Sequence, residues 1–308
     1  MGRRRSSPTD IDGVIVVDKP AGPTSHDVVQ AVRRAAGQSR VGHTGTLDPA
    51  ATGVLVLCLG RSTRLVRFLQ AGSKTYAARM VLGIETDSQD ADGAVVTTTS
   101  AAHIDERSVC EALTRFQGEI EQLPPMVSAV KVGGRRLHTL ARAGEDVDRD
   151  RRRVTVHDLI LDAYVPGEHP EVAFLVTCSA GTYVRTIAHD VGAALGVGGS
   201  LLSLRRLANG PFVAEEAHAL EEIEAAGSAG RLRSLVVDPL TAIERALPTV
   251  AIDDGDLART LSRGGWLPEQ AEVGAYAVRW GDRLVGVYTD RDGYGRPELV
   301  WTRPEELV

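Results

Sequence analysis

The longest uninterrupted apolar run of this chain, residues 54–59, is long enough for one buried β-strand and far too short to span a bilayer. Similar short runs, closed by turn residues, predict strands at 13–18, 74–82, 171–179 and 200–207. Strand and helix patterns alternate irregularly, and the phosphate-binding motifs GxGxxG and GxxxxGK[ST] do not occur. An α+β sheet domain therefore fits the sequence better than a Rossmann or P-loop enzyme.

Helical patterns separate these strands. The clearest begins after a cap at Thr24-Ser25 and continues to Gly37. The other expected segments are a basic amphipathic helix at 62–70, an acidic loop at 85–93, a helix at 105–116, a basic helix at 135–142, a helix from Thr182 and acidic helical sequence at 215–245. After Pro248 the pattern changes to short strands and turns, which predicts a small β-rich C-terminal part.

Composition narrows the class of protein. With 308 residues, 43% of them hydrophobic and 25% charged, the chain can build one large domain and a small one. Its three cysteines, Cys58, Cys110 and Cys178, are too scattered for a disulfide framework or a zinc cluster. The arginines at 3–5 precede polar sequence, so a signal peptide is not expected. These features favour a cytoplasmic protein with no membrane span and no structural metal.

Charge is distributed unevenly along the chain. The formal net charge is −6, yet residues 33–79 carry eight basic side chains against one acid, and residues 215–256 carry ten acids against three arginines. We interpret the basic half as a surface that faces a polyanion. Ordinary solvated helix faces are the alternative.

Asp48 is the one acid between Asp27 and Glu85, in a loop of glycine, threonine and proline among many cations. A neighbouring arginine would keep its carboxylate ionised with a lowered pKa. Asp48 is then either a nucleophile or general base, or a structural residue that caps the turn before Pro49. A retaining glycosidase would need a second carboxylate nearby, and none is close in the sequence.

The residues around Asp48 leave alternatives open. His43 could be a base, a metal ligand or an RNA contact, although no recognised metal spacing includes it. Tyr76 is either a core aromatic or a platform for a nucleobase. Tyr183 and Arg185 stand at a helix start, and Arg185 could pair with Asp48 or contact phosphate.

The segment GHTGTLDP at 42–49, followed by ATGVL at 51–55, closely resembles the active-site segment of the TruB-type tRNA pseudouridine synthases. Further matching segments occur in the family's order: DKPAGPTS at 18–25, KTY at 74–76, QLPP and SAVK within 122–131, GTYVR at 181–185 and LRR at 204–206. The resemblance covers about residues 13–212, and the acidic and C-terminal parts match only loosely.

This resemblance implies the pseudouridine synthase fold, a mixed and mainly antiparallel sheet flanked by helices and loops. We expect a disordered basic N-terminus at 1–12, a catalytic domain at 13–245 and a PUA-like domain at 246–308. An insertion within about 85–155 would bind the T arm, and its 131–154 stretch is rich in cations. The implied reaction converts the uridine at nucleotide 55 of the tRNA T loop to pseudouridine after base flipping, without cofactor or metal.

The resemblance also implies roles for single residues. Asp48 is the catalytic carboxylate, Arg185 is the arginine that pairs with it, and Tyr76 stacks on the target base. The implied substrate-binding residues are His43, Tyr76, Tyr183, Leu204 and Lys19. Of these, Lys19 together with Pro20 is expected to shape the pocket floor more than to touch RNA.

The expected partner is tRNA, and we expect a monomer with no obligate protein partner. Two other functions stay open. A tRNA-folding chaperone would keep the basic surface but would not need Asp48. A guide-RNA-dependent relative would have a fuller C-terminal domain and surfaces for protein partners.

Overall fold

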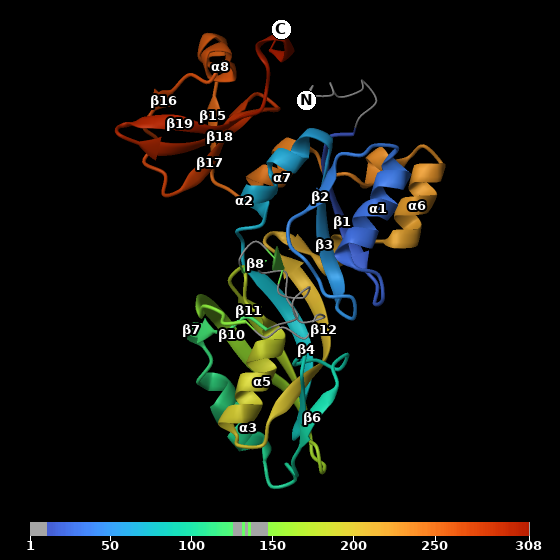
Figure 1. Cartoon of the computed structure of the whole chain (residues 1–308). Helices are drawn as coiled ribbons and strands as arrows, with labels where there is room; N and C mark the ends of the chain where they lie inside the picture. The colour runs from blue at the N-terminus through green and yellow to red at the C-terminus, as the bar shows by residue number, and fades with distance from the viewer. Residues whose placement is uncertain (1–10, 126–130, 133–134, 137–146, 308) are drawn as a thin grey trace.

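The computed structural model describes residues 11–125, 131–132, 135–136 and 147–307 (Figure 1). A ten-stranded sheet runs through the larger part of the molecule, in the order β14-β1-β3-β12-β4-β11-β10-β7, with β2 paired to β3 and β13 to β12. Its strands are β1 Gly13–Lys19, β2 Val41–His43, β3 Thr52–Leu59, β4 Lys74–Leu82, β7 Gly118–Gln122, β10 Arg152–Val165, β11 Glu171–Cys178, β12 Gly199–Asn209, β13 Phe212–Val213 and β14 His218–Ala219.

The pairing in this sheet is antiparallel except between β1 and β14 and between β3 and β12. The predicted α+β class, with a mixed and mainly antiparallel sheet, is therefore confirmed. Residues 54–59 do form a strand buried throughout, because β1 and β3 are covered on both faces.

Two pairs of helices cover the sheet (Figure 1). Helices α1 (Ser25–Ala36) and α6 (Leu220–Ser228) pack together beside β1 and β3. Helices α3 (Glu106–Thr114) and α5 (Val184–Ala194) pack against the half that contains β4, β10, β11 and β12. Both pairs of helices contribute to one continuous core, which is mostly aliphatic.

Helix α1 shows how closely local sequence fixes an element. Thr24 accepts from the backbone N–H of Asp27, and the Asp27 carboxylate accepts from the backbone N–H of Thr24, which forms a capping box. Gly37 ends the helix at φ +61°, a conformation that glycine adopts without strain. Both predicted ends of this helix are confirmed.

The predicted helix at 62–70 is confirmed only in part, because two short helical pieces replace one continuous helix. A 3₁₀ turn, η1 (Gly60–Arg64), is followed by one turn of α-helix, α2 (Val66–Leu69). The cations of this segment serve the C-terminal sheet: Arg61 donates to the carboxylate of Glu306 and the carbonyl of Trp301, while Arg64 and Arg67 donate to carbonyls of the last strand. These three arginines of the basic segment 33–79 therefore make contacts within the molecule, although Arg64 and Arg67 stay exposed at its surface.

The C-terminal part is a five-stranded sheet, in the order β15-β17-β18-β19-β16, which confirms the predicted small β-rich module. Its elements are β15 Thr249–Ile252, α8 Gly255–Ser262, β16 Leu267–Pro268, β17 Ala275–Trp280, β18 Arg283–Arg291 and β19 Tyr294–Val300. The sequence did not predict α8. A shared core that includes Val16, Val56, Val287 and Leu299 joins this sheet to the outer face of β1 and β3. The predicted boundary at 245–246 falls between α7 (Pro239–Glu244) and β15.

The acidic segment 85–93 belongs to a two-stranded ribbon of β5 (Ile84–Thr86) and β6 (Val95–Thr98), whose turn is acidic. The predicted basic helix at 135–142 instead begins as a short strand, β9 (Arg135–Arg136), paired with β8 (Lys131–Val132). Its remaining residues lie outside the described part of the chain.

Most of the predicted disordered N-terminus, residues 1–10, also lies outside the described residues. Ile11 and Asp12 are held in place, however. The backbone N–H and carbonyl of Ile11 both hydrogen bond the amide of Gln38, and Asp12 accepts from the backbone N–H of Arg61. Of the predicted N-terminal segment 1–12, these two residues are the ones that the structure describes. None of the described helices has the length and apolar character needed to cross a membrane.

Candidate active site

The loop between β2 and β3 carries Asp48 and is tied to the start of α1. The hydroxyl of Ser25 accepts from the backbone N–H of Leu47 at 2.8 Å and donates to its carbonyl at 2.9 Å. Leu47 is buried in the core, and the Asp48 carbonyl accepts from the Ala51 backbone N–H in the turn that follows. These contacts fix the backbone on both sides of Asp48.

Two buried cations lie beneath this loop. The Lys19 ammonium donates to the carbonyls of Pro20, Pro49 and Ala51 at 2.9, 2.9 and 2.7 Å. Arg206 donates to the carbonyl of Val54 at 2.6 Å and to two carbonyls nearer Asp48, those of residues 45 and 46. Both side chains are almost fully buried. Lys19 therefore lies under the loop and is not among the residues that line the pocket. This position agrees with the expectation that Lys19 shapes the pocket floor more than it touches RNA.

Arg185 stands at the start of α5 between two carboxylates. One terminal nitrogen lies 3.4 Å from an Asp48 oxygen, and the other donates to Asp90 at 2.9 Å. Arg185 is 5% exposed, Asp90 is 19% exposed and the Asp48 side chain is 51% exposed. The predicted pairing of Arg185 with Asp48 is present. Asp90, in the turn of the β5–β6 ribbon, is the second carboxylate that Arg185 contacts.

The predicted lowering of the Asp48 pKa is wrong. Desolvation by the surrounding protein raises this pKa above its ordinary value of 3.8; Arg185 opposes the rise, and the negative charge of Asp90 adds to it. Half of the side chain still reaches water at the pocket mouth, which moderates the effect. The sequence indicates the arginine, which lowers the Asp48 pKa. It does not show the burial of Asp48 by the pocket walls or the approach of Asp90, which both raise it.

Activity that requires the ionised form of Asp48 should fall as pH drops through this raised pKa. Replacing Asp90 with asparagine removes a charge that raises the Asp48 pKa and leaves Arg185 to pair with Asp48 alone. We therefore expect the acid limb of kcat/KM in Asp90→Asn to move to lower pH, together with a lower plateau. A pH profile of both proteins measures this, and an acid limb at the wild-type position would contradict it.

The pocket beside Asp48 has a volume of about 260 Å³. Its lining includes Asp48, Tyr76, Tyr183, Arg185 and Leu204, so five of the predicted site residues meet there although they come from distant parts of the chain. Its lining combines aromatic and aliphatic side chains with charged ones, a combination that would suit a small, flat, polar ring such as a nucleobase. Gly45, Thr46, Lys74, Gly181, Thr182, Val184, Leu201 and Arg206 also contribute to the lining.

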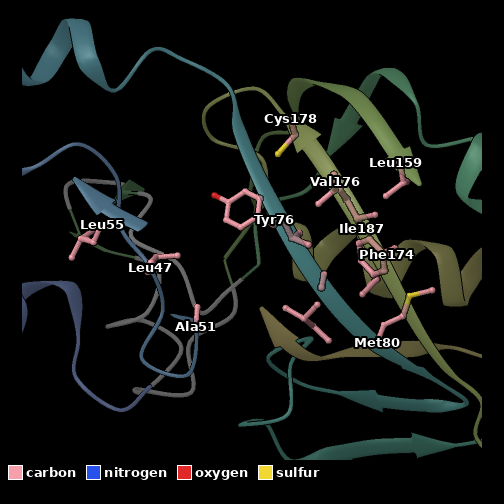
Figure 2. Close-up of a cluster of buried hydrophobic side chains, with 14 of the residues drawn as sticks. Leu47, Ala51, Leu55, Tyr76, Met80, Leu159, Phe174, Val176, Cys178 and Ile187 are labelled. Carbon is pink, nitrogen blue, oxygen red and sulfur yellow. The ribbon is translucent and has the colours of Figure 1, made fainter. Parts of the chain in front are cut away.

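Tyr76 lies at the edge of the core, with its hydroxyl directed toward the side on which Leu47 and Ala51 lie (Figure 2). Its side chain is buried, and this desolvation raises its pKa, so the phenol stays neutral. Tyr183 is the N-cap residue of α5, and its ring lies 5.9 Å from the Arg185 guanidinium carbon. Tyr76 therefore belongs to the core and also lines the pocket, and its role as a platform for a nucleobase stays a prediction.

His43 is not among the residues that line the pocket. It ends β2, and its Nδ1 accepts from the backbone N–H of Gly45 at 3.2 Å. Burial lowers its pKa, which keeps the ring neutral. Within the described residues, no three His, Cys, Asp or Glu side chains lie close enough together to share a metal ion.

The hold of Lys19 on the loop should depend on pH, because burial lowers its pKa to about 8. Above that pH the neutral amine has one N–H fewer, and one of its three carbonyls loses a buried hydrogen bond. We expect kcat to decline as pH rises through about 8. Lys19→Met should lower kcat by about tenfold and remove this alkaline limb. Lys74 also has a pKa of about 8, so the limb must persist in Lys74→Met if Lys19 is its source.

Known proteins are similar to this chain over most of its length. Residues 33–184 match the model of the N-terminal domain of TruB family pseudouridylate synthases, and residues 185–247 match the tRNA pseudouridylate synthase B C-terminal domain. The chain belongs to the TruB family. The tRNA pseudouridine synthase B of Symbiobacterium thermophilum is 49% identical over 82% of each chain. That of Thermobifida fusca is 43% identical over 94% of this chain and 98% of its own length.

Solved structures share the TruB-family architecture. A chain of the "Cbf5-Nop10-Gar1 Complex" superposes with a TM-score of 0.73 at 27% identity, and covers 96% of this chain and 86% of that one. A chain of an "H/ACA RNP bound to a substrate RNA containing 2'-deoxyuridine" superposes with a TM-score of 0.71 at 25% identity, over 96% of this chain and 88% of that one. These likenesses confirm the pseudouridine synthase fold expected from the sequence.

Two residues of this TruB-family site, Asp90 and Arg206, were not singled out from the sequence. Asp90 is one of several acids in an acidic turn, and nothing local marks the one that meets Arg185. Arg206 is one of two adjacent arginines in β12. Strand alternation directs it beneath the loop, whereas Arg205 pairs with Asp18 at the surface. The available signal was the family-like segment LRR at 204–206, which contains Arg206.

Proposed function

We propose that this chain is a tRNA pseudouridine synthase that isomerises the T-loop uridine at nucleotide 55, with Asp48 as the catalytic carboxylate. One observation carries the proposal: Asp48 faces a pocket walled by Tyr76 and Leu204 while Arg185 holds its carboxylate. Relatives named tRNA pseudouridine synthase B, 40–49% identical over most of this chain, support the same activity.

The reaction rearranges one nucleotide. The N1–C1′ glycosidic bond breaks, the uracil turns, C5 bonds to C1′, the C5 hydrogen leaves as a proton and N1 takes up a proton. The target base must first leave the RNA stack, and the Tyr76 ring offsets part of that cost by stacking on it. The Asp48 carboxylate acts at the sugar or the base, and Leu204 packs against the uracil. Arg185 keeps Asp48 ionised and oriented against the desolvation that raises its pKa.

We expect the T arm to be recognised mainly through the RNA backbone, because proteins read folded RNA largely by its shape and by its extruded bases. Arg151 and Arg152 are exposed where the chain enters β10, within the stretch expected to bind the T arm. We expect Arg151→Gln with Arg152→Gln to weaken tRNA binding and to reduce the slope of log K against log salt by about 0.7–0.9 for each phosphate that the variant no longer neutralises. Binding titrations at several salt concentrations measure this, and an unchanged slope would remove these residues from the interface.

We propose that the chain acts alone, without guide RNA or protein partner. The two structural neighbours, from a Cbf5-Nop10-Gar1 complex and an H/ACA RNP, are 27% and 25% identical to this chain. The tRNA pseudouridine synthase B relatives are more similar in sequence, and two of them are covered over 98% and 99% of their length. The test is conversion of a bare T-arm hairpin by the purified chain, with the uridine located by chemical mapping of pseudouridine. Conversion at another uridine, or a requirement for added RNA or protein, would contradict the proposal.

A further inference from the structure

Gln89 adopts an unusual backbone conformation beside the candidate site. Its φ is +65°, in the left-handed region that non-glycine residues rarely occupy and that costs free energy to hold. It stands in the turn of the β5–β6 ribbon, directly before Asp90. Strained conformations of this kind persist only where surrounding contacts enforce them, and they cluster at functional sites.

Two contacts enforce this conformation. The Gln89 carbonyl accepts from the backbone N–H of Leu201 in β12 at 3.0 Å, and Leu201 lines the pocket. The Gln89 side-chain oxygen accepts from the buried hydroxyl of Thr186 in α5 at 2.8 Å. Thr186 directly follows Arg185. Gln89 therefore ties the ribbon turn both to the pocket strand and to the helix that carries the arginine.

The position of Asp90 follows from these ties. Its own turn contacts are local: its carbonyl accepts from Thr86 at 2.7 Å, and its carboxylate accepts from Ser88. They shape the turn, but they do not connect it to α5 or β12. The Gln89 contacts connect the turn to both elements, beside a backbone bridge between Asp90 and Leu201. In this arrangement Asp90 lies 2.9 Å from Arg185.

We propose that Gln89 is a positioning residue: it fixes Asp90 against Arg185 and so limits the hold of that guanidinium on the catalytic carboxylate. Without this anchor the turn relaxes away from α5 and Arg185 pairs with Asp48 alone. The carboxylate then becomes a weaker base and nucleophile. The inference rests on the proposed function, because it concerns the same carboxylate.

Three variants separate the backbone contribution from the side-chain contribution. Gln89→Gly keeps the left-handed backbone at no steric cost and loses only the bond to Thr186. Gln89→Val loses that bond and also disfavours the conformation, because a β-branched residue tolerates positive φ poorly. Thr186→Val removes the donor while keeping the side-chain shape. Val96→Thr, on the exposed face of the same ribbon, is the matched control.

The readouts are the single-turnover rate of tritium release from [5-³H]uridine T-arm RNA at saturating enzyme, the acid limb of its pH profile, and RNA affinity. We expect Gln89→Gly to slow the rate about threefold and Gln89→Val about tenfold or more, with affinity unchanged within about threefold. The acid limb should move to lower pH in Gln89→Val. Thr186→Val should lower the rate when it is introduced into the wild-type chain. Introduced into Gln89→Gly, it should cause no further loss, because the bond between the two side chains is already absent.

A Gln89→Val protein with the wild-type rate would overturn the proposal. So would a slower protein whose acid limb stays in place while its thermal midpoint falls, because that pattern reports a structural role alone. Failure of the proposed function looks different: the wild type itself would bind the RNA and release no tritium, at any pH.

Discussion

Asp48→Asn should reduce uridine isomerisation by on the order of 10⁴-fold or more, to below detection in most assays. The amide has nearly the shape of the carboxylate, so the loop held by Ser25, Lys19 and Arg206 should keep its conformation. What is lost is the negative charge that faces the pocket. Single-turnover tritium release measures the loss.

Binding provides the control for Asp48→Asn. The side chain is half exposed at the mouth of the pocket, and a carboxylate at an RNA-binding surface opposes binding. We therefore expect tRNA affinity to stay within a few fold, or to rise slightly. A loss of binding that matches the loss of turnover would mean that Asp48 is a structural residue of the loop and would revive the turn-capping interpretation.

Arg185→Met should give the second largest effect, a fall in kcat of about 10²- to 10³-fold. Removing this guanidinium leaves Asp48 and Asp90 as neighbouring like charges without their shared cation. Of the charges that oppose the desolvation and lower the Asp48 pKa, only Lys19 then remains, so the carboxylate gains a proton more readily. Turnover should recover partly as pH rises, because high pH restores the ionised form.

Arg185→Lys is the matched control, because it keeps the charge and loses the planar fork. A single ammonium cannot reach both carboxylates as two terminal guanidinium nitrogens do. We expect a loss intermediate between wild type and Arg185→Met. Equal losses in the two variants would indicate that geometry alone matters, whereas full activity in Arg185→Lys would indicate that charge alone does.

Local signals were sufficient for the regular elements. The caps of α1 at Thr24 and Gly37 and the continuous apolar run of β3 are properties of neighbouring residues, so the sequence predicts them well. The segment at 60–69 was predicted only in part: it is helical in two short pieces, and Arg64 and Arg67 donate to carbonyls of β19, more than 200 residues away. The partner of this basic, amphipathic segment is the C-terminal sheet, and residues so distant in the chain cannot be recognised from the segment itself.

The candidate site was predictable to the extent that it lies in motifs. Asp48 and Arg185 were identified, and so was their pairing, which the structure contains. The direction of the Asp48 pKa shift was not predictable from the sequence. It depends on desolvation by the pocket walls and on Asp90, which approaches from the turn of the β5–β6 ribbon. Gln89 was missed for a related reason: its backbone angle is a consequence of contacts with α5 and β12.

The most direct test of the account is to incubate the wild-type chain with T-arm RNA labelled as [5-³H]uridine, and to count tritium released and pseudouridine formed in the same sample. C5 must lose its hydrogen when it bonds to C1′, so the account predicts one tritium released for each pseudouridine at nucleotide 55, with no added cofactor, guide RNA or protein. A well-folded chain that binds this RNA and releases no tritium would contradict the account and leave a tRNA-folding chaperone as the better interpretation.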